Sequence, residues 1–346
     1  MLSSVLFIGD PLNSLAFSSD SSLALAEAAL YLGHQVHWTT PEQLLLANSA
    51  PSIQQFEILK KINPDSPPNT ELVETKSPQH LSAYQKIFVR KDPPFDENYT
   101  ELCWILQQIS SNCVINSPQA LLTHHEKMLP FTLMASGIVP DHSVVPSFVA
   151  QESKHIIAHA ERLFDEASHL MPILTQGSTD VTLKFKVLVK PWRGHGGRGI
   201  QVFSSVVELE NWLLSLSKSS DQTATSSRWI IQPFLPEIFT HGDRRVFVAH
   251  GQVVFDFVRR PAQGRVEANL AQGGSAHLEP LSEVQSEIAN SIAAWLQKEG
   301  IVLAGLDFIG DFLTEVNITS PTGIRTFEHL SRQNVSIGIM QKLLSK

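Results

Sequence analysis

Three oxygen-bearing side chains interrupt two apolar runs near the C-terminal end of the sequence. Asp307, Glu315 and Asn317 lie in residues 302–317, where a Gly-Asp step separates the two runs. A Gly-Asp step between apolar runs is typical of a β-hairpin. Carboxylate and amide oxygens suit Mg²⁺ or Mn²⁺ that is held together with the phosphates of a substrate. The stretch therefore predicts a divalent metal site on a hairpin.

The strand register decides whether these three side chains converge. Glu315 and Asn317 are two residues apart, so they share a face of their strand. A loop of two residues would turn Asp307 and Glu315 to opposite faces, whereas a three-residue loop at 310–312 would place them opposite each other. We predict the three-residue loop, because buried carboxylates are costly unless they are paired or bound to a cation, and the sequence shows no base placed to pair with them. The alternative is that the carboxylates lie on the solvent face of the hairpin.

A glycine-rich segment before this hairpin matches the G-x-G-x-x-G pattern of dinucleotide sites. The glycines that could approach phosphates are Gly194, Gly196 and Gly197. A dinucleotide site needs a helix directly after its glycines, but here the β-type run 200–203 follows, and a helix signal begins only at Ser205. The segment therefore predicts a hairpin flap, whose backbone N–H groups can approach phosphates because glycine lacks a Cβ. Lys190, at the end of the preceding strand, can add an ammonium group; an ordinary flexible hairpin with a solvated lysine is the alternative.

Two arginines lie at the ends of strands that follow the flap. Arg245 is at the start of one predicted strand and Arg259 is at the end of the next. Paired arginines at strand ends are often only solvated, but these accompany a phosphate-binding pattern. Residues 229–236 predict a strand and a linker that suit an adenine pocket, and residues 261–277 have the composition of a mobile lid.

Composition and charge exclude several classes of partner. The chain has 346 residues, a net charge of −8 and a pI near 5.9, which argues against binding to a nucleic-acid backbone. No lysine or arginine precedes Lys60 and no apolar run approaches the length of a membrane span, so we expect a cytoplasmic protein with no membrane partner. Cys103 and Cys113 are expected to be free thiols, and the histidines show no metal-ligand spacing.

The first third of the chain predicts alternating strands and helices, which would form the framework that positions the candidate site residues. Residues 4–8 predict a buried strand, 21–32 a helix, and 36–38 and 87–89 further strands, with a polar, proline-bearing stretch at 63–78 between the last two. This order predicts an open, largely parallel sheet, whose ligands lie beyond the carboxyl ends of the strands.

The middle of the chain gives weaker signals. Residues 156–167 predict an amphipathic helix, and 176–179 and 217–227 predict loops.

The motifs occur in the order found in bacterial-type glutathione synthetase, an ATP-grasp ligase family that the chain resembles over nearly its whole length. The matching segments are R-K-D-P-P-F-D at 90–96, I-N-S-P at 115–118, E-K at 126–127, K-P at 190–191 with the glycines, G-D-R-R-V at 242–246, N-L-A at 269–271, G-L-D at 305–307 and N-I-T-S-P-T at 317–322.

This resemblance implies an α/β protein with the ATP-grasp fold and an N-terminal Rossmann-like domain that contains a parallel sheet. The implied units are a substrate-binding domain at 1–122, a central ATP-grasp subdomain with the flap at 123–206, and a C-terminal ATP-grasp subdomain with the metal site and lid at 207–346. The implied reaction uses ATP to phosphorylate γ-glutamylcysteine to an acyl phosphate, from which the amine of glycine displaces phosphate to form glutathione. The partners are then small molecules, and the family suggests a homo-oligomer.

The resemblance also implies a role for each matching residue. Arg245 and Arg259 would contact the phosphate and the acyl phosphate. The nucleotide-binding residues are Lys127, Lys190, Gly194, Gly196, Gly197, Gln232, Phe234, Leu235 and Asp243. The substrate-binding residues are Ser21, Arg90, Asp92, Asn269, Ser320 and Thr322. The metal ligands are Asp307, Glu315 and Asn317.

The chain departs from the family pattern at positions near the substrates. Glu267 and Ala268 stand where the lid usually carries an arginine, serines at 18–19 replace lysines, and Gly323 and Thr326 replace a cysteine and a glutamate. These departures leave open a ligase that acts on a different γ-glutamyl peptide or amino acid. A non-catalytic nucleotide-binding protein is a further alternative, although no metal carboxylate or phosphate arginine is missing.

Overall fold

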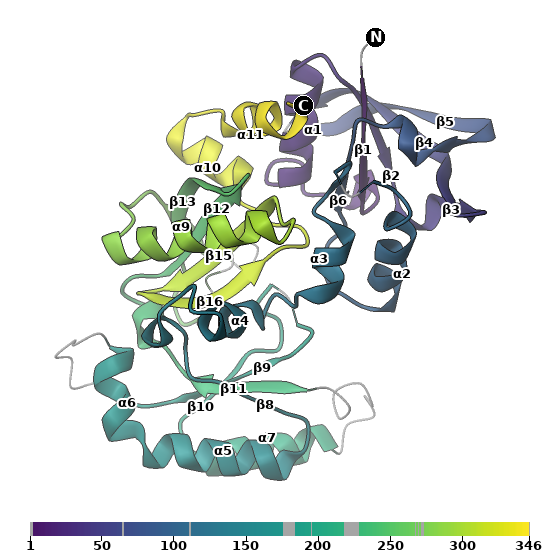
Figure 1. Cartoon of the computed structure of the whole chain (residues 1–346). Coiled ribbons are helices and arrows are strands. Elements are labelled where there is room, and N and C mark those ends of the chain that lie inside the picture. Colours follow the sequence, from purple (N-terminus) through teal and green to yellow (C-terminus); the bar gives the residue numbers. More distant parts are fainter. Residues whose placement is uncertain are drawn as a thin grey trace.

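The computed structural model describes residues 3–345, except 64–65, 111, 176–183, 195, 218–227, 267, 269 and 271–272. The described strands form three sheets, which we call the N-terminal sheet, the lobe sheet and the central sheet. Figure 1 shows the lobe sheet at the bottom, the central sheet in the middle and the N-terminal sheet at the top. Helices and strands alternate along much of the chain, which confirms the α/β class.

The N-terminal sheet is built around parallel strands. These strands are β1 (Ser4–Gly9), β2 (Gln35–Thr39), β6 (Lys86–Arg90) and β7 (Val114–Ile115). Helices cover both of its faces, as is usual for parallel strands: α1 (Ser21–Tyr31) on one side, and α2 (Glu97–Leu106) and α3 (Pro118–Thr123) on the other. The strands and the first helix that the sequence predicts here are confirmed.

A long antiparallel hairpin extends this sheet where the sequence predicted only a polar stretch. It consists of β4 (Ala50–Asn63) and β5 (Ser66–His80), and β3 (Leu44–Ala47) also pairs with β4. The sequence indicated 63–78 only as a polar, proline-bearing stretch between strands, and it did not indicate β5. Strand β5 has no fully buried residue along its described length, so it lacks the apolar alternation that would have revealed it.

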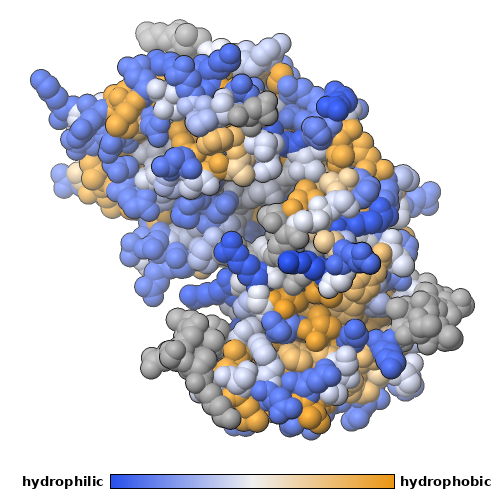
Figure 2. Space-filling view, turned by 180° about the vertical axis from the view of Figure 1, so that it is seen from behind, coloured by the Kyte–Doolittle hydropathy of each residue, from blue (hydrophilic) through white to orange (hydrophobic). Residues whose placement is uncertain are grey.

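The lobe sheet carries the glycine flap. Its strands are β8 (Phe148–Ala150), β9 (Val187–Pro191), β10 (Gln201–Phe203) and β11 (Trp229–Pro233). Helices α5 (Ser153–Asp165) and α7 (Val206–Ser217) pack on one face, and α6 (Ala167–Leu174) follows α5. Figure 2 shows this lobe from behind, at the bottom of the view, with hydrophobic surface near its junction with the rest of the molecule.

The predicted amphipathic helix at 156–167 is confirmed as α5, which begins slightly earlier. The predicted loop at 176–179, and all but the first residue of that at 217–227, lie outside the described residues. The lobe sheet continues past residue 206, where we expect a domain limit, since β11 pairs with β9. The proposed limits remain predictions.

The central sheet carries the predicted metal hairpin. Its strands are β12 (Asp243–Ala249), β13 (Gln252–Arg260), β14 (Ser275–His277), β15 (Leu303–Ile309) and β16 (Phe312–Asn317). Helix α9 (Glu283–Lys298) packs on the face that holds Val246 and Leu306, and α4 (Leu129–Ala135) contacts β16. On the opposite face, Phe247, Phe255 and Phe257 pack in a second core with residues of the last two helices, and the charged residues occupy the other end of that face.

The end of the chain returns to the first domain. Helix α10 (Ile324–Ser331) leads to α11 (Val335–Leu344), which packs against α1 (Figure 1). Short 3-10 helices complete the described elements: η1 (Leu12–Ser14), η2 (Pro41–Gln43), η3 (Leu81–Ala83), η4 (Asp141–Ser143) and η5 (Pro236–Ile238). Among the described helices, none combines the length and the apolar character needed to cross a bilayer.

Candidate active site

The β15–β16 hairpin brings Asp307, Glu315 and Asn317 to one face, by a route other than the predicted one. Ile309 pairs with Phe312, so the connecting loop has two residues, and the prediction of a three-residue loop was wrong. A β-bulge restores the register: Phe308 pairs with Leu313 but Asp307 pairs with Glu315, which leaves Thr314 as the extra residue. The predicted convergence of the three side chains is what the register produces.

The register of the neighbouring strands adds charged residues to the same face. Arg245 on β12 lies opposite Asp307, which in turn lies opposite Glu315 on β16. Asp243, two residues before Arg245, lies opposite Arg259 on β13. Because alternate residues share a face of a strand, these side chains form one polar surface on the central sheet.

Asp307 is held by two arginines. Arg245 donates through Nε to Oδ1 at 2.6 Å and through a terminal nitrogen to Oδ2 at 3.0 Å, and Arg259 donates to Oδ1 at 2.9 Å. The amide nitrogen of Asn317 also donates to Oδ2, at 3.0 Å. The expectation that no base would pair with the carboxylates was therefore wrong, because sequence separation hid the cross-strand arginines.

These contacts set the charge states of the buried groups. Burial alone would raise the pKa of Asp307, but Arg245 and Arg259 outweigh it and hold that pKa below its ordinary value. Burial would likewise lower the pKa of Arg259, but Asp243 and Asp307 raise it instead. For Asp243, burial dominates over its pairing with Arg259 and raises the pKa to about 6. Asp307 and Arg259 are therefore an ionised pair.

Two buried polar atoms at this site have no hydrogen-bond partner within the described part of the chain. They are Oδ1 of Asp243 and Nε of Arg259, although Oδ2 of Asp243 accepts a bond of 2.6 Å from Arg259. Buried polar atoms are rarely left unpaired, so each one calls for a specific explanation. An N–H donor and a carboxylate oxygen at this surface suit a bound phosphate and its counter-ion.

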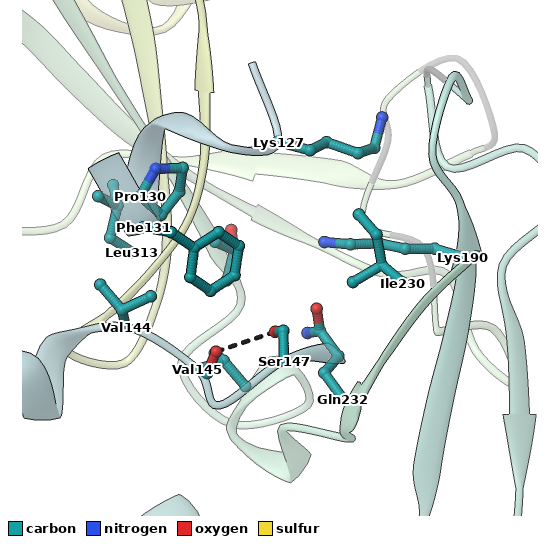
Figure 3. A pocket seen from close by; sticks show the side chains of 11 residues that line it. Lys127, Pro130, Phe131, Val144, Val145, Ser147, Lys190, Ile230, Gln232 and Leu313 are labelled. Atoms are coloured by element: carbon teal, nitrogen blue, oxygen red, sulfur yellow. Dashed lines mark hydrogen bonds between the residues drawn. The ribbon is translucent and has the colours of Figure 1, made fainter. Parts of the chain in front are cut away.

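The two predicted nucleotide lysines face this surface from the flap side. Lys127 Nζ lies 3.4 Å from the carboxylate of Glu315 and also donates to the backbone carbonyl of Gly194. Lys190 projects from β9 into a pocket that Lys127 also lines (Figure 3). Burial lowers the pKa of Lys190. Lysines from two distant segments thus meet the carboxylate hairpin.

The pocket between the lobe and the central sheet has polar and apolar sides. Gln232 and Lys190 line it from the lobe sheet. Part of the apolar lining is Ile230, in the segment that the sequence assigned to an adenine pocket, and the rest, which the sequence did not indicate, comes from Pro130, Phe131, Val144, Val145 and Leu313. Figure 3 shows the ring of Phe131 facing the side chains of Lys190 and Ile230 across the pocket. Apolar side chains that line a pocket have the same sequence pattern as those of a hydrophobic core, so no motif marks them.

Phe234 and Leu235 do not line this pocket. Both are buried directly after β11, where Phe234 packs with Ile238 and Leu235 with Val145. Their proposed part in adenine binding remains a prediction.

The glycines of the flap join β9 to β10, as the sequence predicted. Gly196 and Gly197 have φ values of 62° and 75°, the left-handed region that glycine adopts without strain. At Gly194 an added Cβ would lie 2.4 Å from the ring of Pro191, so a side chain there would displace the flap.

The proposed substrate residues of the first domain are bonded to the turn that follows β16. Arg90 donates to Ser22 Oγ and to the carbonyl of Pro321, both at 2.9 Å. Ser21 Oγ accepts from the backbone N–H groups of Gly323 and Ile324 at 3.0 and 3.1 Å. These groups are buried and engaged within the protein, so they join the first domain to the central sheet.

The remaining proposed substrate residues differ in accessibility. Ser320 is buried, the side chain of Thr322 is exposed, and the N–H of Asp92 donates to Asp10 at 2.9 Å. Asn269 lies outside the described residues. Direct substrate contact by this group remains a prediction.

Glu126 has a role that the motif alone did not reveal. Its carboxylate accepts three bonds of 2.8 to 2.9 Å, from the N–H groups of Ile318 and Thr319 and from the Thr319 hydroxyl. Burial, reinforced by the nearby Glu315, raises its pKa. Glu126 therefore fixes the segment of Lys127 against the end of the metal hairpin.

The donor set fits a divalent cation. Asp307, Glu315 and Asn317 present hard oxygen atoms from one face of the β15–β16 hairpin, and oxygen is the ligand type that Mg²⁺ and Mn²⁺ prefer. Asp307 already accepts four hydrogen bonds, about as many as a carboxylate has lone-pair sites. Metal coordination by Asp307 therefore requires that one of these bonds be given up.

Comparison with known proteins gives a consistent result. The model for the N-terminal domain of prokaryotic glutathione synthetase matches residues 4–121, and that for the ATP-grasp domain of prokaryotic glutathione synthetase matches residues 178–332. The glutathione synthetase of Shewanella oneidensis is 32% identical over 323 residues, which cover 92% of this chain and 91% of that protein. The glutathione synthetase of Parasynechococcus marenigrum is 28% identical over 342 residues, 98% of each chain.

A solved structure shows the same fold. The D-cycloserine synthetase DcsG superposes with a TM-score of 0.64, at 15% identity, over 98% of both chains. At that identity the likeness concerns the fold alone. It agrees with the ATP-grasp fold and the additional N-terminal domain.

Proposed function

The chain belongs to the prokaryotic glutathione synthetase family, and on that premise we propose that it is the ATP-dependent ligase that joins γ-glutamylcysteine to glycine. In this reaction a carboxylate oxygen of the peptide attacks the γ-phosphorus of ATP, and ADP leaves. The amine of glycine then attacks the acyl carbon, and phosphate leaves as the amide bond forms. Both steps require that negative charge on phosphate be neutralised and that the reacting groups be aligned.

The observation that carries this proposal is the meeting of Lys127 with Glu315. Their 3.4 Å contact joins the flap side of the pocket to the polar surface of the central sheet, and Lys190 lines the same pocket. Phosphates bound there would lie between cations on one side and carboxylates on the other. A divalent cation held by Asp307, Glu315 and Asn317 would supply further charge neutralisation.

We assign the charged residues as follows. Lys127 and Lys190 bind the phosphates of ATP, while the flap glycines offer backbone N–H groups. Arg245 and Arg259 neutralise the transferred phosphoryl group and the acyl phosphate. The Nε of Arg259, which has no partner among the described residues, supports this assignment. Asp307, Glu315 and Asn317 hold Mg²⁺ or Mn²⁺, and Asp243 pairs with Arg259 beside them.

The proposal is tested by measuring glycine-dependent ADP release with γ-glutamylcysteine and identifying the product by mass. We expect turnover that requires ATP, both substrates and a divalent cation, and that falls at least about 100-fold in Glu315→Ala. Undiminished turnover of Glu315→Ala would refute its assigned role. A panel of other γ-glutamyl donors and amine acceptors tests the substrate pair, because a better substrate than γ-glutamylcysteine or glycine would overturn that choice.

We further propose that the protein is a cytoplasmic homo-oligomer, as the family suggests. Light scattering after size-exclusion chromatography gives the mass of the particle. A mass near the 38.3 kDa of one chain would contradict the oligomer.

A further inference from the structure

The root of the flap is in contact with the segment that carries Lys127. The rings of His125 and Trp192 stack with centroids 4.5 Å apart and planes 21° apart. Trp192 follows the last residue of β9, and its backbone N–H donates to the carbonyl of Arg228 at 2.9 Å, which fixes it beside β11. His125 begins the turn into α4, where its carbonyl accepts from Met128 and Leu129. Both partners of the stack are therefore anchored by their own backbones.

The position of this stack relates it to the phosphate site. His125 is two residues before Lys127, and Trp192 is two residues after Lys190. The stack therefore spans the two segments that carry the phosphate lysines. Without it, the contact of Lys127 with Gly194 would be a flexible side chain reaching across to the flap.

The contact is one between uncharged rings at neutral pH. Burial, with a contribution from Lys127, lowers the pKa of His125 to about 4. Its Nδ1 is buried with no hydrogen-bond partner among the described residues, so the imidazole acts through its ring face. A phenyl ring could therefore replace it, which separates stacking from acid–base or hydrogen-bonding roles.

We propose that His125 and Trp192 are positioning residues, which hold the flap against the Lys127 segment so that Lys127 and Lys190 bind the phosphates of ATP together. Neither residue belongs to the motifs that identify the family. The proposal rests on the proposed use of ATP, and it assigns a task to a pair that does not itself touch the reacting atoms. Loss of the stacked pair raises KM for ATP more than it lowers the rate of the chemical step.

The test measures KM for ATP and kcat separately in His125→Ala, Trp192→Ala and the double variant, with His125→Phe and Trp192→Phe as conservative replacements. Aromatic pairs contribute about 0.5–1.5 kcal/mol, so we expect KM for ATP to rise about 2- to 12-fold in the alanine variants, with kcat changed less than about 2-fold. The double variant should be no worse than the more impaired single variant, and the phenylalanine variants should restore KM.

The neighbouring His124 provides a matched control. Its ring contacts that of Trp295, with centroids 5.3 Å apart. Trp295 lies on α9, away from the flap, so His124→Ala should leave KM for ATP unchanged. Thermal stabilisation by added ATP gives a second readout of nucleotide binding that does not depend on turnover. An unchanged KM in His125→Ala, fully additive effects of the two alanine variants, or a His125→Phe variant as impaired as His125→Ala would each overturn the proposal. Wild-type activity with ATP tests the proposed function itself, so the two failures are distinguishable.

Discussion

Arg245 and Asp307 lie directly opposite each other on β12 and β15, and the guanidinium donates a hydrogen bond to each carboxylate oxygen. The side chains are each only 7% exposed, and Gly305 leaves space for the arginine, since a Cβ there would lie 2.9 Å from one of its terminal nitrogens. Together with Arg259, this pair gives Asp307 a structural part in the protein in addition to its proposed part in metal binding.

This double role predicts that Asp307 and Glu315 differ in their contribution to stability. Asp307→Asn leaves the buried Arg245 without its carboxylate partner and Arg259 with only Asp243, so it should cost about 3 kcal/mol or more of unfolding free energy. Glu315→Gln changes a side chain that is 26% exposed, and Lys127 keeps its bond to the Gly194 carbonyl, so it should cost less than about 1 kcal/mol. Urea unfolding of both variants measures the difference, and equal losses would contradict the structural role of Asp307. Both variants should lose ligase activity.

The two phosphate lysines should affect catalysis more than folding. Lys127→Met and Lys190→Met each remove a cation from the pocket, so we expect kcat/KM for ATP to fall about 10- to 1000-fold. Lys154→Met is the control, because Lys154 is exposed and pairs only with Glu152 among the described residues. Steady-state ADP release measures all three variants. Wild-type kinetics in both pocket variants would remove the lysines from the site.

The buried imidazole of His37 should make the protein less stable at mildly acid pH. Its imidazole is buried against Phe56 and bonded to the Tyr84 hydroxyl at 2.7 Å, and burial lowers its pKa from 6.5 to about 4. Between these two values the unfolded chain binds a proton that the native protein does not, so unfolding becomes easier as the pH falls. The loss should approach about 3 kcal/mol near pH 4. Urea unfolding from pH 7 to 4.5 should show a shallower pH dependence in His37→Phe, and identical slopes would exclude His37 as the cause.

Gly323 should be intolerant of a side chain. Its φ is 122°, and an added Cβ would lie 2.8 Å from the ring of Phe257, so Gly323→Ala should cost about 1–3 kcal/mol. Gly338, inside α11, is the matched control, because an added Cβ would meet no atom within 4 Å. Gly338→Ala should stabilise the protein by about 0.5–1 kcal/mol. Thermal unfolding of both variants tests the contrast, and a neutral Gly323→Ala would contradict it.

The sequence predicted much of the site because motifs and alternation describe single strands well. The flap, the end position of Lys190 and the shared face of Glu315 and Asn317 follow from residue types and a two-residue period. The bulge at Thr314 was not predictable in this way, because it depends on pairing between strands. Its hydroxyl donates to the carbonyl of Asp307 at 3.0 Å, which helps to hold the extra residue in place.

Contacts between distant segments account for the other differences. Arg245 and Asp307 are 62 residues apart, so their pairing became visible only with the strand order of the central sheet. Strand β5 escaped prediction because neither of its faces is buried, and its position is set by main-chain bonds to β4. The apolar wall around Phe131 likewise assembles from segments far apart in the sequence, at 130–131, 144–145, 230 and 313.

The bonds between the first domain and the central sheet have a consequence for motion. Arg90 and Ser21 bind the turn at 321–324, Asn116 donates to the carbonyls of Leu303 and Ile318, and α11 packs on α1. These contacts join the first domain to the central sheet. The bonds named here do not involve the lobe of β8–β11, so we expect the lobe, rather than the first domain, to move relative to the central sheet when ATP binds.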